Sequence, residues 1–488
     1  MMQALLINLF LAAAVATSSA TGQGDVLNDY VDAAEAAGFT GGVLVARGDE
    51  ILLERAAGRR VPGSDEPVRP DTVATTGSIT KQFTAAAILQ LVEAGDIDLD
   101  DSLSRYFADV PEDKAGITVH HLLSHQGGFP GAIGDDRERV GRDEFVRRAM
   151  AVPLDFDPGT AYEYSNVGFS LAAAILELVS GQRYEEYLRA NLFEPAGMSD
   201  TGYVLPAWAP ERLAHGATRD GENWGTVYER AIKDGGPGWH LLGNGGIHST
   251  LGDMYRWHRA LQGDEILSDE SKALMYGRHA DEGGGTWYGY GWSIEPTPWG
   301  EMVAHNGGNP YFFADYLRFP EGDVVIYLWT TSHDRRIKDM ARPLAEILFA
   351  GESVSFPPEP APLVGAGEGP PAAEGSLAAK WQLPGSHRGQ RAAEMLEAIT
   401  TDDATYRQKF IDKGFEPGLV ERNGVDRLLG LFDRMRDDIG AFEVRGARPS
   451  PEGVEVVLES ARGVVVIGLA LEPEVPHRIK GVDVTIGD

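Results

Sequence analysis

Ser78 and Lys81 stand three residues apart at the start of an apolar segment, GSITKQFTAAAILQLVEAG, that closes at Gly95. The apolar spacing and the closing glycine predict a helix, and residues at i and i+3 share one face of it. A serine hydroxyl needs a base to take its proton, and a lysine can be that base only when its pKa falls from about 10.4 toward neutrality. Burial and the positive end of a helix both favour the neutral amine. The pair therefore suggests an activated serine, with a helix cap followed by a solvated lysine as the alternative.

Tyr164 and Asn166 form a second candidate pair, on a loop just before the apolar run 167–179. A phenol and a carboxamide two residues apart can point into one pocket. The phenol can relay a proton when nearby cations lower its pKa from about 10, and the amide can bind a substrate carbonyl. A tyrosine packed at the start of a helix is the alternative.

A third element, His305-Asn306-Gly307-Gly308, lies between an aromatic run at 287–299 and a β-prone stretch at 311–330. Glycines allow backbone N–H groups to come close to a ligand, as an oxyanion hole requires. The tetrapeptide is therefore a candidate for holding a developing negative charge, and taken by itself it is also a plausible turn.

The elements that must position these residues follow from the pattern of apolar residues. A helix is expected over 25–37, and the β-prone runs 42–45 and 51–54 flank Arg47-Gly48-Asp49, which predicts a hairpin. Near the C-terminus, a helical stripe over 425–439 precedes three strand patterns, at 453–459, 463–471 and 478–486. Helices followed by a meander predict a small α+β module.

In this order, the three elements resemble the motifs of the serine β-lactamase and penicillin-binding-protein superfamily. Tyr164-Ser165-Asn166 matches the Y-x-N form and His305-Asn306-Gly307 the H-x-G form, so the sequence is most similar to the class C-like members: D-alanyl carboxypeptidases, D-aminopeptidases and esterases. The framework segments FTGGVLVARGDEILLERAAG, ITVHHLLSHQGGFP, LFEPAGMSDTGY and GGIHSTLGDMYRW also look like this family. The resemblance covers about 25–350. It implies an α/β (α+β) serine β-lactamase-like fold, with an antiparallel sheet flanked by helices and an all-helical subdomain.

The resemblance also implies roles for the candidate residues. Ser78 would be the acylated nucleophile, Lys81 and Tyr164 would share the acid and base work, and Asn166 would orient the substrate carbonyl. The backbone N–H groups of Ser78 and Gly308 would form the oxyanion hole.

The third motif departs from the K-T-G form of the family. His305 would stand where many relatives have a lysine, and Asn306 where they have a hydroxyl. Because a histidine is largely neutral at pH 7, this departure weakens the case for a substrate with a free C-terminal carboxylate and favours an ester or other acyl substrate.

Other residues have competing interpretations. The spacing of His121 and His125 is that of helical metal ligands, but no glutamate accompanies them, so a capping and core role is expected for these histidines and for His120, and no metal site is predicted. Ser170 and Ser199 match only half of a G-x-S-x-G nucleophile elbow, which argues against a lipase-type hydrolase.

Three aromatic or imidazole side chains also stand outside the motifs. Most of the tryptophans are expected in the core, and Trp239, in a glycine-rich segment, is the one candidate for a pocket lip. In the C-terminal module, His477 and Tyr406 are interpreted as structural.

Composition limits the partners. The 488 residues include 74 acidic and 43 basic side chains, which leaves a net charge of −31. A surface so negative repels phosphate backbones and anionic membranes, so nucleic acid is excluded as a partner, and we interpret the charge as surface adaptation that disfavours anionic substrates. The chain has no cysteine, which excludes disulfides, thiolate catalysis and a lipid anchor on cysteine. No cofactor is indicated.

The chain is expected to divide into four parts. Residues 1–20 resemble a signal peptide, because a 13-residue apolar run at 4–16 precedes small residues and is too short to span a bilayer. This predicts an exported protein, periplasmic or secreted, without a stable membrane span after cleavage. A hydrolase domain follows at 25–350, then a linker at 351–376 rich in proline and glycine, and then an accessory domain at 377–488 that resembles cystatin-like or NTF2-like modules.

Two functions remain open at this point. The first is a serine hydrolase that forms an acyl-enzyme on Ser78 and cleaves an ester, the favoured substrate, or a D-configured amide in a small molecule or peptide. The second is a non-catalytic binding protein, for example for peptidoglycan, that retains the fold. A binding protein has no physical need of a lysine base beside a serine. The oligomeric state stays open.

Overall fold

The computed structural model describes residues 24–488 apart from Asp234, Glu352, 358–371, Glu374, 451–452, Arg462, 473–476 and Asp488. The expected signal peptide and most of the expected linker lie outside the described residues. The chain divides into two compact units, Met1–Phe356 and Pro357–Asp488. Among the described residues, no helix is both long and apolar enough to cross a membrane.

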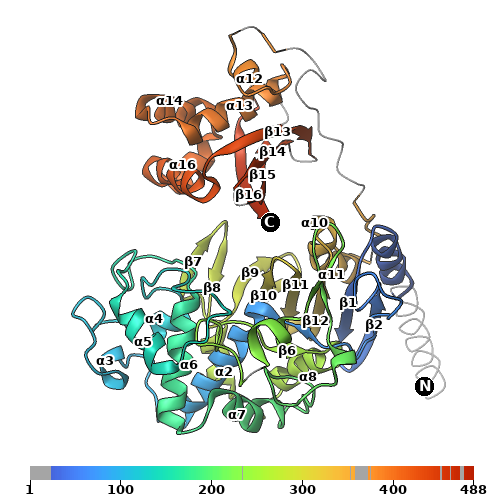
Figure 1. Cartoon of the computed structure of the whole chain (residues 1–488), viewed down its shortest axis with the longest axis vertical. Helices are drawn as coiled ribbons and strands as arrows, with labels where there is room; N and C mark the ends of the chain where they lie inside the picture. Colours follow the sequence, from blue (N-terminus) through green and yellow to red (C-terminus); the bar gives the residue numbers. More distant parts are fainter. Residues whose placement is uncertain are drawn as a thin grey trace, which may run out of the picture. The chain divides into compact units, whose positions relative to one another are not determined.

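The first unit contains an antiparallel sheet of eight strands in the order β2-β1-β12-β11-β10-β9-β8-β7 (Figure 1). The predicted hairpin is present, since β1 and β2 pair on either side of Gly48. The first strand of the unit pairs with its last, so the intervening segments fold onto the sheet they interrupt. The strands are β1 (Gly41–Arg47), β2 (Glu50–Ala57), β7 (Ala280–Gly283), β8 (Thr286–Tyr288), β9 (Ser293–Thr297), β10 (Gly300–Asn309), β11 (Phe312–Phe319) and β12 (Val324–Thr330).

Both faces of the sheet are buried at β1 and β12, which explains why these two strands are apolar along most of their length. In β1, Val43 and Val45 pack into a core with the helix over 24–36 and with α11, whereas Leu44 and Ala46 pack into a larger core on the other face. Helix α8 packs on β1 and β12 from that second side. The two-residue period of the strands thus divides one apolar run between two cores.

The helices of the first unit flank the sheet and gather in a helical region beside it (Figure 1). Helices α2 and α6 pack together, and α4 and α5 pack on α6. The helices are α2 (Thr80–Glu93), α3 (Leu103–Tyr106), α4 (Val119–Leu123), α5 (Arg142–Ala151), α6 (Asn166–Ser180), α7 (Tyr184–Leu188), α8 (Leu251–Gln262), α9 (Asp269–Met275), α10 (Arg335–Lys338) and α11 (Ala341–Ala350).

Short elements complete the first unit. Strand β3 pairs with β6, and β4 pairs with β5. Their bounds, with those of the single-turn helices, are β3 (Ala74–Thr75), β4 (Gly216–Ala217), β5 (Asn223–Gly225), β6 (His248–Ser249), η1 (Gly77–Ile79), η2 (Arg189–Phe193), η3 (Pro210–Arg212), η4 (Tyr228–Ile232) and η5 (Pro320–Gly322).

The second unit is the α+β module that the sequence predicts, with helices first and an antiparallel sheet after them. The sheet has four strands in sequence order, and its first strand, β13, was not predicted from the sequence. Helices α13, α14 and α16 share an apolar core with the sheet. The elements are α12 (Leu377–Lys380), α13 (His387–Thr400), α14 (Ala404–Gly414), α15 (Pro417–Asn423), α16 (Val425–Ile439), β13 (Phe442–Pro449), β14 (Gly453–Ser460), β15 (Gly463–Leu471) and β16 (Ile479–Gly487).

Candidate active site

The turn that carries Ser78 depends on a glycine. Gly77 has a φ of +54°, a conformation that favours glycine, and it opens η1, which runs directly into α2. Ser78 is partly exposed, whereas Lys81, one helical turn along, is fully buried. A hydroxyl that solvent can reach therefore lies one turn from an amine that solvent cannot reach.

Strand β10 runs against this turn with almost no space between the two backbones. A Cβ atom added at Gly307 would lie 2.5 Å from the backbone nitrogen of Ser78, and one added at Gly77 would lie 2.6 Å from the backbone nitrogen of Gly308. No other residue fits at either position without displacing the backbone. The close approach brings together the two backbone nitrogens that the sequence assigns to an oxyanion hole.

Lys81 is held by neutral oxygen atoms. Its Nζ donates to Oδ1 of Asn166 and to the backbone carbonyl of Asn244, both at 2.7 Å, and it lies 4.6 Å from the centre of the Tyr164 ring. Within the described part of the chain, no carboxylate forms an ion pair with it. Burial lowers the pKa of Lys81 well below its ordinary value of 10.5, and the charge of Asp136 opposes this shift only in part. The amine is therefore displaced toward its neutral, basic form.

Tyr164 and Asn166 reach the site from the start of α6. The backbone N–H of Asn166 donates to the carbonyl of Gly131 at 2.9 Å, which fixes the first turn of the helix. Burial raises the pKa of Tyr164 above its ordinary value, although a hydrogen bond with Ser78 opposes the shift. The phenol is therefore protonated at neutral pH and hydrogen-bonded to the candidate nucleophile.

His305 is buried in β10 with both ring nitrogens engaged. Its Nδ1–H donates to the carbonyl of Asn306 at 2.5 Å, so Nε2 carries a lone pair and accepts from the hydroxyl of Tyr288 at 3.0 Å. Burial, together with the charge of Lys81, lowers the pKa of His305 to about 3. The side chain is a neutral, fully bonded imidazole and offers no cation to a carboxylate. Asn306, the next residue, is exposed.

His125 is a residue at the site that the sequence did not single out for chemistry. Its ring contacts those of Tyr164 and Tyr288, at 4.4 Å and 4.5 Å between ring centres. Its Nδ1 accepts the backbone N–H of Ser165 at 3.0 Å, and its buried Nε2 has no hydrogen-bond partner among the described residues. Burial lowers the pKa of His125 well below its ordinary value, so it packs as a neutral aromatic ring that supports the tyrosine.

The other histidines that the sequence grouped together are structural. His121 closes a capping box with Thr118 at the start of α4, as expected from its predicted capping role. His120 bonds through Nδ1 to the hydroxyl of Tyr290 at 2.8 Å. Within the described part of the chain, no group of three or more histidine or acidic side chains could hold a metal ion.

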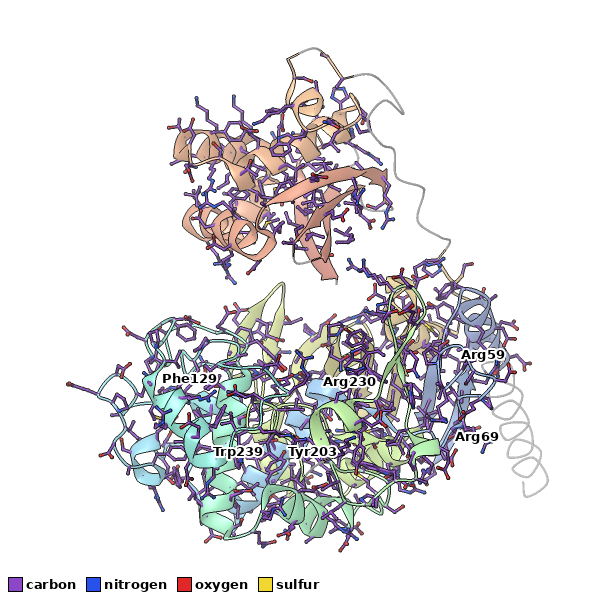
Figure 2. The ribbon with its side chains drawn as sticks, viewed as in Figure 1. Arg59, Arg69, Phe129, Tyr203, Arg230 and Trp239 are labelled. Carbon is purple, nitrogen blue, oxygen red and sulfur yellow. The ribbon has the colours of Figure 1, made fainter. Side chains whose placement is uncertain are left out.

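The ring and backbone contacts of Trp239 are with residues other than the catalytic candidates. The residue, labelled in Figure 2, is 9% exposed. Its ring packs near Phe145, and its backbone N–H donates to the carbonyl of Val140. This placement favours the core-packing alternative over a pocket lip.

Three of the remaining candidates from the sequence have structural contacts, and the fourth, Ser199, is exposed. Ser170 is buried and donates to the carbonyl of Leu242 at 2.7 Å. In the second unit, Nδ1 of His477 donates to the carbonyl of Glu472 at 2.8 Å and the hydroxyl of Tyr406 to that of Glu394 at 3.4 Å.

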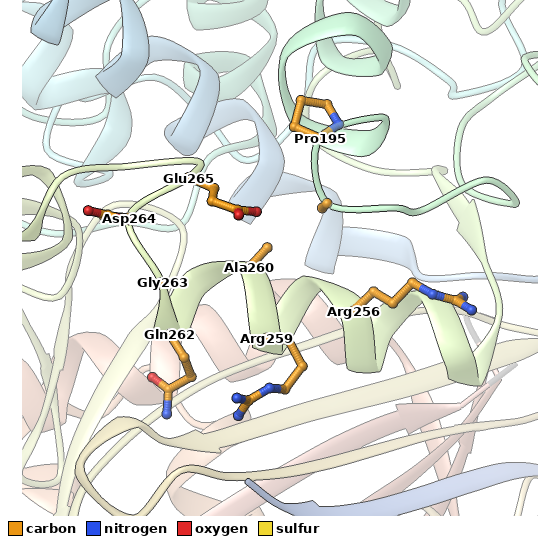
Figure 3. A pocket seen from close by; sticks show the side chains of 9 residues that line it. Pro195, Arg256, Arg259, Ala260, Gln262, Gly263, Asp264 and Glu265 are labelled. Atoms are coloured by element: carbon orange, nitrogen blue, oxygen red, sulfur yellow. The ribbon is translucent and has the colours of Figure 1, made fainter. Parts of the chain in front are cut away.

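A pocket of about 470 Å³ lies elsewhere in the first unit, between Pro195 and the C-terminal end of α8 (Figure 3). Two arginines line it, but each is already paired. Arg256 contacts Asp253 and Arg259 contacts Asp323, both at 2.7 Å. The two arginines of this pocket are therefore committed to carboxylates of the same unit.

Residues 27–348 match the family model described as Beta-lactamase. Penicillin-binding protein 4* of Bacillus subtilis (strain 168) is 28% identical over 351 residues, which are 66% of this chain and 75% of that protein. Esterase EstB of Burkholderia gladioli is 28% identical over 289 residues, 51% of this chain and 73% of the esterase. Among solved structures, the D-amino acid amidase of Ochrobactrum anthropi SV3, complexed with L-phenylalanine amide, has a TM-score of 0.57 and 25% identity, and the match covers 68% of this chain and 98% of the amidase.

Proposed function

The chain belongs to the beta-lactamase family, and on that premise we propose that it is a serine hydrolase that forms an acyl-enzyme on Ser78 and cleaves an ester or a D-configured amide bond. One observation carries the proposal. Lys81 is buried beside the candidate nucleophile and donates to two neutral oxygens. Among the described residues, no carboxylate forms an ion pair with it. A structural lysine would be paired with an acid, whereas a general base must be able to lose its proton near neutral pH.

The hydrogen bonds of Lys81 support a division of labour at the site. A neutral amine has two N–H groups and one lone pair, and the two N–H groups match the oxygens of Asn166 and Asn244. The lone pair is then free to accept the proton of Ser78, with the phenol of Tyr164 as a relay. Because the pKa of Tyr164 is raised by burial, we assign the base role to the lysine and a proton-relay role to the tyrosine.

The proposed reaction proceeds in two halves. Ser78 Oγ bonds to the substrate carbonyl carbon while its proton passes to Lys81, and the oxyanion is held by the backbone N–H groups of Ser78 and Gly308. Collapse breaks the bond to the leaving alcohol or amine, which takes that proton and leaves an ester on Ser78. Water then attacks this ester by the same route and releases the acid.

The state of His305 supports a substrate without a free carboxylate next to the scissile bond. A buried neutral imidazole, bonded at both nitrogens, cannot supply the charge that a carboxylate needs. Esters, and amides that lack this carboxylate, therefore fit the proposal better than a peptide that ends in D-alanine.

Intact-protein mass spectrometry tests the proposal. The protein is exposed to a fluorophosphonate, a p-nitrophenyl ester, a D-alanyl-D-alanine peptide and a penicillin, and a mass increase equal to the bound acyl or phosphonyl group is expected from at least the first two. Ser78→Ala should gain no mass. If the wild-type protein forms no adduct and hydrolyses none of the compounds, the hydrolase proposal is wrong and a binding role is favoured.

We also propose that the protein is exported, as the N-terminal sequence pattern indicates. The mass of the protein recovered outside the cytoplasm, compared with that of the full chain, tests whether the segment before about residue 20 is removed. For the second unit we propose a cystatin-like or NTF2-like fold, supported by helices that pack on a four-stranded antiparallel meander. Its experimental structure, compared with those folds, tests this assignment.

A further inference from the structure

Tyr164 lies on a loop that is bonded to the loop after α4. Just after the tyrosine, Oγ of Ser165 donates to the carbonyl of Pro130 at 2.7 Å, and the backbone N–H of Asn166 donates to the carbonyl of Gly131 at 2.9 Å. These two bonds fix the start of α6. They leave the position of the tyrosine itself to be set by other contacts.

His125, on the loop after α4, bonds to the backbone on both sides of Tyr164. Its carbonyl accepts the N–H of Glu163 at 3.1 Å, and its Nδ1 accepts the N–H of Ser165 at 3.0 Å. The rings of His125 and Tyr164 also contact each other, at 4.4 Å between ring centres. One residue therefore holds the tyrosine through the peptide before it, the peptide after it and its ring.

The backbone of His125 has a conformation that is uncommon for a residue with a side chain. Helix α4 ends with Ser124 as its C-cap, and His125 follows with a φ of +58°. Glycine is the usual residue at this position after a helix. Strained positions of this kind persist where the surrounding contacts determine them, and they cluster at functional sites. What the side chain binds therefore explains the histidine better than the turn does.

The bond with Ser165 fixes the protonation state of the His125 ring. A backbone N–H can only donate, so Nδ1 carries a lone pair and the proton of the neutral ring is on Nε2. Nε2 is buried and has no partner among the described residues. Burial and the charge of Lys81 lower the pKa of His125 well below its ordinary value. The ring is therefore held in one neutral tautomer that accepts from Ser165.

The hydroxyl of Tyr164 depends on such contacts because it stands at the far end of its side chain. It is hydrogen-bonded with Ser78, and its ring lies 4.6 Å from Nζ of Lys81. A proton relay works only while its atoms stay within hydrogen-bond reach of each other. A small rotation of the backbone at 163–165 moves the hydroxyl further than it moves the backbone, and so interrupts the path.

We propose that His125 is the positioning residue of this relay: as a neutral acceptor it holds the peptide after Tyr164 and so keeps the phenol within reach of Ser78. The inference rests on the proposed hydrolase function and adds a residue to it. His125 itself transfers no proton in this scheme and acts on the reaction only through the tyrosine.

Two substitutions separate the acceptor of His125 from its ring. His125→Phe keeps a ring and removes the acceptor, so acylation by a p-nitrophenyl ester, per folded molecule, should slow about 10²-fold, the cost of a displacement of about 1 Å. His125→Asn places Oδ1 near the position of Nδ1 and tolerates the positive φ, so it should recover most of this loss without the ring. The inference is wrong if His125→Phe acylates at the wild-type rate or if His125→Asn is no faster than His125→Phe.

A double-mutant cycle tests whether His125 acts through the phenol. Tyr164→Phe removes the hydroxyl of the relay, so adding His125→Phe to it should slow acylation little further. A residue that supports the site in some other way would slow acylation by the same factor in both backgrounds. Losses that multiply therefore contradict the positioning role.

The matched control is His121→Phe, the same change on the same helix. Nδ1 of His121 also accepts a backbone N–H, that of Thr118 at 3.2 Å, at the start of α4. The control should lower the midpoint of thermal unfolding and leave acylation per folded molecule unchanged. If it slows acylation as much as His125→Phe does, general damage to α4 explains both variants and the inference is wrong.

Hydrogen exchange followed by mass spectrometry separates this inference from the proposed function, because it involves no reaction of Ser78. In a peptide that spans 160–170, exchange should be faster in His125→Phe than in wild type, and slower again in His125→Asn. Absent fluorophosphonate labelling of wild type contradicts the hydrolase proposal, whereas unchanged exchange in His125→Phe contradicts the positioning role of His125.

Discussion

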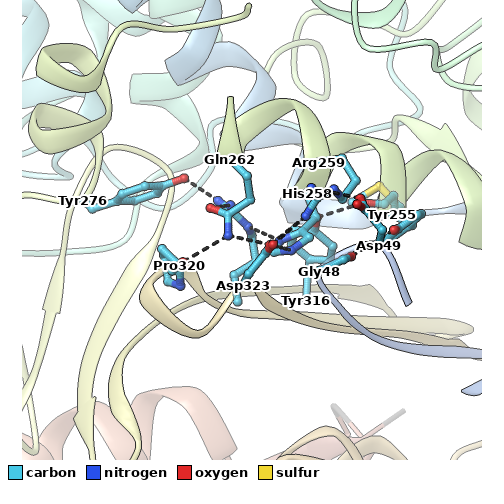
Figure 4. Close-up of polar contacts among 12 residues, drawn as sticks. Gly48, Asp49, Tyr255, His258, Arg259, Gln262, Tyr276, Tyr316, Pro320 and Asp323 are labelled. Carbon is cyan, nitrogen blue, oxygen red and sulfur yellow. Dashed lines mark hydrogen bonds and ion pairs between the residues drawn. The ribbon is translucent and has the colours of Figure 1, made fainter. Parts of the chain in front are cut away.

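Lys81 and Arg318 are two fully buried cations of the same unit, and their surroundings differ. Arg318 donates through Nε to Nδ1 of His258 at 2.9 Å and through Nη1 to the hydroxyl of Tyr276 (Figure 4). His258 in turn donates through Nε2 to Asp323 at 3.0 Å. Among the described residues, Lys81 contacts neutral carbonyl oxygens and the rings of Tyr164 and Phe169, and no carboxylate.

The carboxylate of Asp323 completes the network around Arg318. It accepts two hydrogen bonds from Arg259, at 2.8 Å and 2.7 Å, and one from Gln262 at 2.7 Å. Burial alone would raise the pKa of Asp323, but these hydrogen bonds hold it below its ordinary value. The negative charge stays in place and compensates the arginines.

The comparison shows that burial of a cation does not by itself mark a functional site. A buried cation linked to a carboxylate stays charged and joins elements, here α8, β11 and the turn before β12. A buried amine that faces only neutral acceptors loses its proton more easily and becomes a base. The following predictions test this distinction, from the largest expected effect to the smallest.

Lys81→Met keeps the length of the side chain and removes the amine. The rate of acylation by a p-nitrophenyl ester should fall about 10³-fold, within the range for loss of a general base. The midpoint of thermal unfolding should change little, because the lost hydrogen bonds are offset by burying a thioether in place of an amine. A variant that acylates at the wild-type rate would contradict the base role.

Arg318→Met makes the matching change in the structural network. The free energy of unfolding should fall by about 3–5 kcal/mol, because the partners of a buried cation lose their donor. Urea unfolding followed by tryptophan fluorescence measures it in the first unit, which contains eight of the nine tryptophans, all between 208 and 329. The acylation rate per folded molecule should be unchanged. If the variant and the wild type were equally stable, the network around Arg318 would not stabilise the first unit.

These two cations also show what a sequence can and cannot predict. Ser78, Lys81, Tyr164 and Asn166 stand in short motifs whose spacing has a chemical meaning, so local patterns find them. The hairpin β1–β2 and the start of α6 were predicted for the same reason, since turn residues and apolar periods are local. The roles of the motif residues remain predictions.

The partners of these residues come from distant segments and have no local signal. Lys81 donates to the backbone carbonyl of Asn244. Because every residue has a backbone carbonyl, no pattern of side chains predicts which one lies beside the lysine. The network of Asp323 consists of ordinary polar residues on α8 and a turn, brought together only by the antiparallel sheet. For His125 the sequence predicted a capping or core role, but not its packing on the ring of Tyr164, which depends on tertiary structure.

The pH dependence of the acylation rate tests whether Lys81, unlike Arg318, loses its proton near neutral pH. Lys81 must be neutral to accept a proton, so the rate with an uncharged ester should rise with pH and reach its plateau well below 10.5, the ordinary pKa of lysine. Asp136→Asn removes a charge that raises this pKa, so the rise should move to lower pH. Tyr164, His125 and His305 have pKa values shifted away from neutrality by burial and should not add a limb there.

Stability should follow the same ionisation with a defined sign. Between the lowered pKa of folded Lys81 and 10.5, the unfolded chain holds a proton that the folded chain has released, so wild type should gain stability as pH rises through this window. Lys81→Met should lack this gain. A rate profile that rises only near 10.5, with no difference between the two proteins in stability, would mean that Lys81 is not shifted.

The smallest effect on stability is expected from Asp315, a carboxylate that, among the described residues, lacks the hydrogen-bonded arginine of Asp323. It lies half-buried on β11 opposite Asn306, and burial raises its pKa to about 7 against the charge of Arg342. Between its ordinary pKa of 3.8 and about 7, the folded chain holds a proton that the unfolded chain has released, so stability falls as pH rises through this window. Asp315→Asn should therefore be more stable than wild type by about 1 kcal/mol at pH 8, the effect being reduced by solvent, and should show no gain at pH 4. Asp323→Asn removes a carboxylate that is compensated by Arg259, so this variant should instead be less stable than wild type at pH 8. Urea unfolding of both variants at the two pH values tests whether the partners of a half-buried carboxylate decide the sign of its effect on stability.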